Sequence, residues 1–288
     1  MSVLSRMNRL PVRRVAGGAM KLPRTMVKRL TGRGLILHAP DFPLVLLFSE
    51  KAGCTSLTKW FLFQIGKLDE ATEFHPWVHR YRQSVLCRQP GYEWQALWLL
   101  LRRGKPIVKL VRNPYDRAVS SYLATLGASH SRDGENWAHK LVAAARAGAG
   151  KPAEVPALSF RDFLGFLAAT GTGRDKLDKH VARQHVEGEE HRIDRIIRLE
   201  RFAEEIRQLE SEFSLATSPL ELITTSRHHR SAGLRDAEAV VGGPDVELTS
   251  EQVRKGNVPA YQTLYTDDTR RLVRTCFAAD FEAYGYDE

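Results

Sequence analysis

The sequence predicts an α/β protein, a three-layer fold built on a doubly wound parallel sheet. Residues 43–49 and 105–112 are largely apolar runs of strand length, as is typical of strands buried on both faces of a parallel sheet. Each run leads through a short loop into a helix-forming segment, and another helical stretch separates the two units. Repeated strand–loop–helix order indicates a doubly wound sheet, here in a single domain with a helical insertion.

The first unit begins with the apolar run over residues 43–49 and continues into a helix over residues 55–65. Thr55 or Ser56 is suited to cap the start of this helix, because a hydroxyl can accept a hydrogen bond from a free backbone N–H. Gly66 is suited to end it.

The second unit is preceded by a helix over residues 94–103, which ends at Gly104. The strand over residues 105–112 then leads into Asn113 and Pro114. Asparagine is a good N-cap and proline is favoured at the first helical position, so a helix is expected to begin there.

The middle of the chain contains an insertion over residues 127–157, rich in Gly, Ala, Ser and Pro. It is expected to hold a short helix over residues 137–146 and a flexible segment over residues 147–156. Ser159 can then cap a helix over residues 160–169.

The last third predicts a strand over residues 195–199, an amphipathic helix over 202–213 and a loop over 233–243. Residues 267–284 form a second amphipathic pattern. Its apolar face is expected to consist of Leu272, Val273, Cys276, Phe277, Phe281 and Tyr284.

The basic charge is concentrated in a leader, residues 1–34, which carries nine Lys/Arg and no acidic residue. The remaining 34 Lys/Arg balance all 34 Asp/Glu, so residues 35–288 are formally neutral. The leader could lie on an anionic membrane, serve in targeting, or be a solvated and disordered tail. It lacks the apolar core of a secretory signal, and no run of about 18 apolar residues predicts a membrane span.

The three cysteines, Cys54, Cys87 and Cys276, are widely spaced and contain no Cys-x-x-Cys pair. This pattern argues against a disulfide framework or a zinc site, and it suits a reducing compartment. A cytoplasmic location is therefore expected.

Residues 51–56 predict an anion-binding loop between the first strand and its helix. Small residues there let backbone N–H groups approach an oxyanion, and the helix N-terminus favours negative charge. The loop consists of Lys51, Ala52, Gly53, Cys54, Thr55 and Ser56. An ATP- or GTP-binding loop would need Gly-Lys-Ser/Thr at its far end, whereas here the lysine comes first. A single 5′-phosphate with its leaving bond fits this loop better than a triphosphate.

Arg112 and Ser120 predict a second anion site. Arg112 stands at the end of its strand, and Ser120 lies two turns into the following helix. A guanidinium and a hydroxyl can together bind a second phosphate. Two anion sites at the ends of two strands suggest a nucleotide with phosphates at both ends of its nucleoside.

These two motifs resemble those of sulfotransferases that use 3′-phosphoadenosine 5′-phosphosulfate (PAPS). Residues 51–56 resemble the 5′-phosphosulfate loop, and residues 111–122 resemble the 3′-phosphate motif with its Arg–Ser spacing of eight. The closer similarity is to the carbohydrate-type branch, the HNK-1 and chondroitin sulfotransferase group with its bacterial relatives. Weaker matches follow in the expected order at residues 160–164, 178–184, 194–200 and 280–286. One departure is Glu50, where the family often has proline.

The resemblance, which covers residues 43–287, implies the P-loop-like sulfotransferase fold and PAPS as co-substrate, with no metal. Lys51 is expected to hold the bridging oxygen and the departing phosphate during in-line transfer. The acceptor is expected to be a hydroxyl of a carbohydrate or glycolipid, acted on in the cytoplasm or at the inner face of the membrane.

The base that deprotonates the acceptor is expected between the two phosphate motifs, where His79, His75, Glu73 and Glu93 are candidates. His79 is favoured because it begins an apparently helical stretch over residues 79–89. His180 is a candidate for acceptor binding.

A basic turn in the last third resembles a 3′-phosphate loop of the cytosolic branch, although an exposed basic turn explains it equally well. It consists of Arg254, Lys255 and Gly256. The alternatives to a sulfotransferase are a nucleotide-dependent small-molecule kinase, or a non-enzymatic protein whose basic leader binds membrane or nucleic acid.

Overall fold

The computed structural model describes residues 36–102, 104–129, 136–225 and 242–287. In this part of the chain the main sheet has four strands in the order β1-β2-β3-β5. They are β1 (Ile36–Leu37), β2 (Val45–Phe48), β3 (Ile107–Val111) and β5 (Arg195–Arg198). The last three are parallel, and β1 pairs with β2 in antiparallel fashion. The expected parallel sheet is confirmed, with an antiparallel edge strand added.

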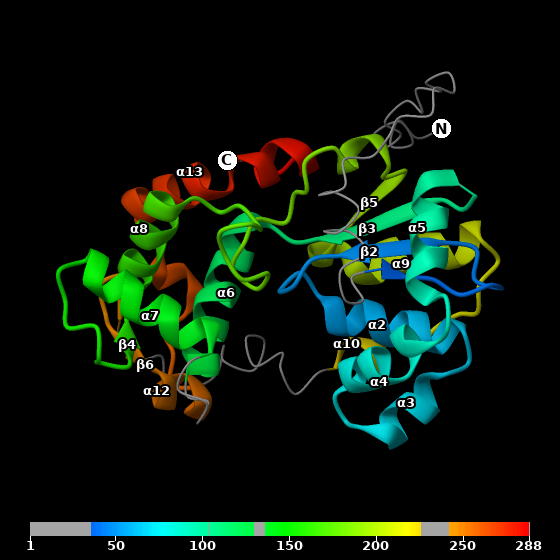
Figure 1. Ribbon diagram of the computed structural model, residues 1–288, viewed down its shortest axis with the longest axis horizontal. Coiled ribbons are helices and arrows are strands. Elements are labelled where there is room, and N and C mark those ends of the chain that lie inside the picture. The colour runs from blue at the N-terminus through cyan, green and yellow to red at the C-terminus, as the bar shows by residue number, and fades with distance from the viewer. Residues whose placement is uncertain (1–35, 103, 130–135, 226–241, 288) are drawn as a thin grey trace, which may run out of the picture.

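Helices cover both faces of this sheet (Figure 1). On one face Val45 and Leu47 of β2 pack against α5 (Tyr92–Arg102). On the other face Leu46 and Phe48 join a core formed with α2 (Cys54–Gln64) and α9 (Phe202–Glu212). Every residue of β2 and β3 is buried, as expected of strands that helices cover on both faces in a three-layer fold.

The face with α2 carries further short helices. These are α3 (Leu68–Phe74), α4 (Val78–Ser84), the 3₁₀ turn η2 (Leu86–Arg88) and α10 (Leu220–Thr224). The single helix expected over residues 79–89 is therefore wrong, since α4 ends at Ser84 and the chain tightens into η2. Helix α4 also begins one residue earlier than expected, at Val78.

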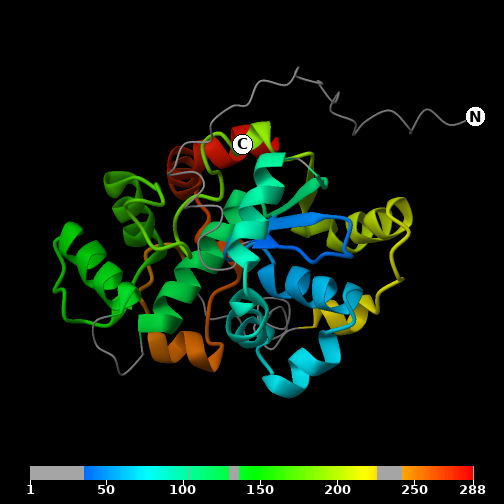
Figure 2. The same ribbon diagram turned by 45° about the vertical axis from the view of Figure 1, so that its right-hand side comes forward.

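A second core lies beside the sheet and is largely helical (Figures 1 and 2). It contains α6 (Pro114–Ser129), α7 (Trp137–Gly148), α8 (Phe160–Thr170), α12 (Ser250–Lys255) and α13 (Asp267–Tyr284). A small antiparallel pair, β4 (Ala157–Leu158) and β6 (Leu248–Thr249), belongs to the same half. Since α6 follows β3 directly, it connects the sheet to this helical half. The 3₁₀ turns η3 (Glu189–His191), η4 (Leu199–Arg201) and η5 (Tyr261–Leu264) complete the described elements.

Most predicted helix boundaries in this half are confirmed. Asn113 Oδ1 accepts a hydrogen bond from Tyr115 N at the start of α6 (2.9 Å), and Ser159 caps α8. Helix α13 has the expected bounds. Helix α7 runs two residues beyond the prediction, and α6 extends into the expected insertion as far as Ser129. The leader and most of the loop expected over residues 233–243 lie outside the described residues.

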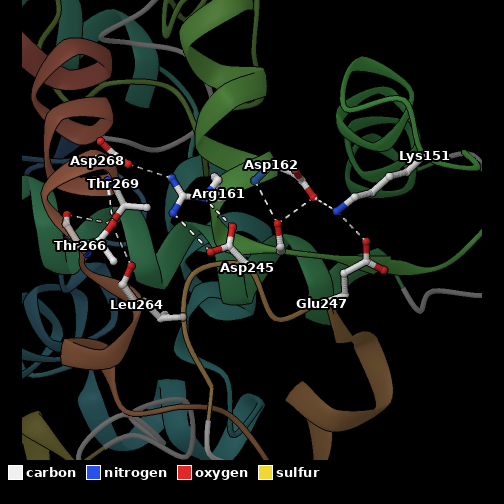
Figure 3. Close-up of polar contacts among 10 residues, drawn as sticks. Lys151, Arg161, Asp162, Asp245, Glu247, Leu264, Thr266, Asp268 and Thr269 are labelled. Atoms are coloured by element: carbon white, nitrogen blue, oxygen red, sulfur yellow. Dashed lines mark hydrogen bonds and ion pairs between the residues drawn. The ribbon is translucent and has the colours of Figure 1, made fainter.

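Ion pairs tie the insertion to the C-terminal part of the chain (Figure 3). Lys151 Nζ lies 2.6 Å from Asp162 Oδ2 and 2.9 Å from Glu247 Oε1. Arg161 Nε lies 2.5 Å from Asp245 Oδ1, and its Nη1 lies 3.7 Å from Asp268 Oδ2 of α13. These contacts hold the segment after α7 and the start of α8 against the strand region around residues 245–249.

Cys54, Cys87 and Cys276 are free thiols. Among the described residues, no helix is both long enough and apolar enough to cross a membrane.

Candidate active site

The loop after β2 turns sharply before α2 begins. Lys51 (φ 66°) and Gly53 (φ 85°) both have left-handed backbone conformations, which are strained for a side chain such as that of lysine. A Cβ at Gly53 would lie 2.5 Å from a side-chain carbon of Leu199. The left-handed turn therefore favours glycine at this position, and a larger side chain would also have to displace the Leu199 side chain.

The start of α2 differs from the sequence prediction. The N-cap is Gly53, which has no side chain with which to cap the helix. The expected cap by Thr55 or Ser56 is wrong, because the left-handed turn at Gly53 starts the helix earlier and places both residues inside its first turn. That turn contains no acidic residue. The positive end of the helix dipole thus faces the loop without a carboxylate in its own first turn, an arrangement that suits an anion.

The second predicted anion site adjoins this loop. Because β2 and β3 are parallel neighbours, Lys51 and Arg112 emerge at the same edge of the sheet. Arg112 Nη1 donates a hydrogen bond to the Lys51 carbonyl oxygen (3.3 Å). Burial lowers the pKa of Lys51; nearby Cys54 raises it, and the positive charges of Arg112 and Arg117 lower it further. An anion bound between these cations would relieve their mutual repulsion.

Arg112 is held in place by Gln184, which is fully buried. The side-chain amide of Gln184 accepts from Arg112 N (3.0 Å) and donates to Arg112 O (2.8 Å). Its backbone N–H in turn donates to Asp280 Oδ2 of α13 (2.9 Å). Ser120 lies in the second turn of α6 and keeps partial exposure. The end of β3 is therefore fixed by a segment more than 70 residues later in the chain.

The structure separates the two candidate histidines. His79 is 4 % exposed, and its Nε2 lies 3.1 Å from Thr55 Oγ1 and 3.5 Å from Cys54 Sγ. His75 is exposed, and its Nδ1 accepts from Trp77 N (2.9 Å). Of these two histidines, His79 is thus the one brought against the loop. Glu73 and Glu93, the carboxylate candidates, are both exposed.

Two residues beside the loop, Glu50 and Arg117, are buried and make contacts that the sequence did not predict. Glu50 is 6 % exposed; its Oε1 lies 3.3 Å from Lys179 Nζ, and its buried Oε2 has no hydrogen-bond partner among the described residues. Arg117 is 1 % exposed and donates from Nε to the Glu50 carbonyl oxygen (3.1 Å) and from Nη2 to that of Ala182 (2.7 Å). Burial lowers the pKa of Arg117 to about 10. The sequence signals for them were the unusual residue before Lys51 and an arginine on the apolar face of a helix.

His180 lies on the side of the helical insertion. Its ring stacks on Trp137 at the start of α7, with centroids 5.3 Å apart and planes within 7°. Its Nδ1 lies 2.6 Å from Asp178 Oδ1. The adjacent Lys179 reaches Glu50, so the segment carrying His180 lies between the loop and the insertion.

The basic turn at residues 254–256 lies elsewhere on the helical half. Gly256 (φ 82°) is the C-cap of α12, and Lys255 pairs with Glu251 in the same helix (2.7 Å). The neighbouring Val253 approaches Gly127, near the C-terminal end of α6 and two turns beyond Ser120. The glycine is explained by the helix end, and a role of Arg254 at the 3′-phosphate stays a prediction.

Across the described ranges, no group of three or more His, Cys, Asp or Glu side chains could hold a metal ion. Comparison with protein-family models matches residues 36–287 to the model described as Sulfotransferase family. Searches of curated proteins and of solved structures found no match.

Proposed function

Because the chain belongs to the sulfotransferase family, we propose that it moves the sulfuryl group of PAPS to a hydroxyl of a carbohydrate or glycolipid. The observation that carries the donor half is the adjacency of Lys51 and Arg112 at the ends of two parallel strands. PAPS has a phosphate on each side of its ribose, so two neighbouring cationic sites fit it better than one extended triphosphate loop would.

The residues of the loop would act by positioning and by stabilising charge. Lys51 and the N-terminus of α2 would bind the 5′-phosphate and the negative charge that develops on it as the sulfur–oxygen bond breaks. Arg112 and Ser120 would bind the 3′-phosphate and fix the nucleotide at its other end. PAPS, when bound, supplies the activated sulfuryl group.

His79 is proposed as the base that takes the proton from the acceptor hydroxyl. Its support is that Nε2 lies against Thr55 and Cys54 at the loop, while His75 is exposed to solvent. Replacing His79 with alanine should lower kcat about 10²- to 10⁴-fold, with a smaller effect on nucleotide affinity. His75→Ala is the matched control and should change neither. Equal effects of the two changes would refute the assignment.

The acceptor site is proposed between the loop and the helical insertion. The stacked pair Trp137 and His180 offers an aromatic surface with Asp178 beside it, and aromatic surfaces with a few fixed polar groups are typical of small-molecule sites. The free cysteines suit a reducing compartment, which supports a reaction in the cytoplasm or at the inner face of the membrane. Transfer of labelled sulfate from PAPS to glycan and glycolipid acceptors tests this part.

Calorimetry with adenosine 3′,5′-bisphosphate, the product nucleotide, tests the donor half. The wild type should bind it without added metal. Arg112→Ala should bind about 10- to 150-fold more weakly, since a charge-assisted hydrogen bond is worth about 1.5–3 kcal/mol. Lys51→Ala should lose at least as much, and Lys67→Ala, at an exposed lysine paired with Glu70, should match the wild type. Absence of bisphosphate binding, with binding of ATP and Mg²⁺ instead, would overturn the proposal in favour of a kinase.

A further inference from the structure

Helix α5 carries two apolar faces, of which the sheet covers only one. Ala96, Leu99 and Leu100 are buried against the strands. Trp94, Trp98 and Leu101 occupy the other face and are 77 %, 55 % and 44 % exposed. Their i, i+4, i+7 spacing aligns them in one stripe along the helix. We call these three residues the α5 stripe.

The packing of the described residues does not explain the α5 stripe. The Trp98 ring approaches Gly104, where a Cβ would lie 3.6 Å from it, yet more than half of the side chain stays exposed. Two exposed tryptophans on one helix face are costly in water, because each indole offers a large apolar surface. Tryptophan is enriched at the membrane–water interface, where its ring lies at the level of the lipid headgroups. The stripe therefore has the composition of a surface that meets lipid.

The basic leader joins the fold next to this helix. Tyr92, the first residue of α5, donates from its hydroxyl to the carbonyl oxygen of Ile36 (2.8 Å), and Ile36 is the first described residue after the leader. Nine Lys/Arg and no acidic residue thus precede a point in contact with α5. Arg102 is the last residue of α5, and Arg192 Nη1 donates to the carbonyl oxygens of Leu100 and Leu101 in its last turn (3.4 Å each). Exposed Glu93 is the acidic residue of the helix.

We propose that the α5 stripe and residues 1–34 dock together on an anionic lipid bilayer surface. The stripe would insert indole rings among the headgroups, and the leader would supply electrostatic attraction. Stable peripheral binding takes two such signals, since either one alone is weak. This inference is independent of the sulfuryl-transfer chemistry and could fail without affecting it.

Vesicle flotation with the full-length chain tests the proposal. Wild type should bind vesicles of phosphatidylcholine with phosphatidylglycerol, and bind vesicles of phosphatidylcholine alone much more weakly. The double variant Trp94→Ser/Trp98→Ser should bind the anionic vesicles about tenfold more weakly or worse. Leu222→Ser is the matched control, because Leu222 is an equally exposed apolar residue (66 %) on α10, and it should bind like the wild type.

A second variant tests the leader. Replacing Arg6, Arg9, Arg13 and Arg14 with glutamine should lower binding by about a hundredfold or more, since each basic residue near the surface contributes about fivefold. Circular dichroism and urea unfolding unchanged from the wild type would show that both variants are folded. Wild-type binding by the tryptophan variant, or equal binding to neutral vesicles, would overturn the proposal. So would a wild-type dimer in sedimentation equilibrium that the tryptophan variant loses, because the stripe would then be a protein interface.

Discussion

Gln184→Met tests how the 3′-phosphate site is positioned. Gln184 is fully buried, and its amide forms two hydrogen bonds with the backbone of Arg112. Methionine has nearly the same volume but cannot replace either bond. The change therefore leaves one backbone N–H and one carbonyl oxygen without their partner, at the strand end that carries the arginine.

The expected loss of stability follows from those two groups. Leaving a buried donor or acceptor unpaired costs about 1–3 kcal/mol, so the free energy of unfolding should fall by about 2–6 kcal/mol. Arg112 is half-buried, and water can reach part of this site, which favours the lower half of that range. A domain stable by about 5–15 kcal/mol would still fold. Without the amide clamp, Arg112 should also bind the bisphosphate about tenfold more weakly.

Urea unfolding gives the change in stability, and calorimetry well below the unfolding transition gives the change in affinity. Gln208→Met is the matched control, since Gln208 is exposed on α9 and accepts a bond from Arg195; it should stay within about 0.5 kcal/mol of wild type. If Gln184→Met also stays within that range and binds the bisphosphate normally, the clamp has no structural role and the reasoning is wrong.

Four further substitutions probe the loop and the ion pairs. The pKa of Lys51 is lowered by burial and by nearby cations. Bisphosphate affinity should therefore be full below that pKa and fall by up to about tenfold per pH unit above it. When calorimetry is repeated toward alkaline pH, the Lys51→Arg variant should keep its affinity. Gly53→Ala should cost about 1–3 kcal/mol in urea unfolding, because alanine is strained at φ 85°, and stability equal to wild type would contradict this. Asp245→Asn breaks an exposed pair and should cost at most about 1 kcal/mol, while Glu247→Gln, whose partner Arg146 is only 5 % exposed, should cost more. Hydrogen bonds from Arg146 and Lys151 hold the pKa of Glu247 below its usual value. The contribution of Glu247 to stability should therefore be present at neutral pH and be lost as the pH falls through that lowered pKa. Equal thermal stability of Asp245→Asn and Glu247→Gln at neutral pH would refute the comparison.

The sequence predicted the sheet well because its signal is local. A strand buried on both faces must be apolar at nearly every position, and residues 45–48 are all buried. Helix starts with an asparagine or serine cap were predicted for the same reason, since the capping bond joins residues two or three apart. The start of α2 was mispredicted because its geometry depends on positive φ at Lys51 and Gly53. The presence of a lysine does not predict that backbone conformation.

Lys109 shows why much of the site could not be predicted. It lies within a strand that otherwise reads as apolar, and it is 2 % exposed. Its Nζ contacts Glu189 Oε1 (2.5 Å), Tyr284 Oη (2.7 Å) and the carbonyl oxygen of Gln184 (2.9 Å). These partners are 75 to 175 residues away in sequence. Burial lowers the pKa of Lys109, while the charge and hydrogen bond of Glu189 raise it, so the lysine is tolerable only in the complete fold.

The same long-range contacts explain how the two halves of the molecule form one site. The Gln184 carbonyl accepts from Lys109 of β3 and from Ser49 Oγ after β2 (3.3 Å), while its amide clamps Arg112. Asp280 of α13 holds the backbone of Gln184 (2.9 Å). A single buried residue therefore contacts both strand ends that lead to the proposed phosphate sites and the C-terminal helix of the helical half. These bonds link α13 through Gln184 to the strand ends that carry Lys51 and Arg112, so the C-terminal helix contributes, together with the sheet, to the distance between these two residues.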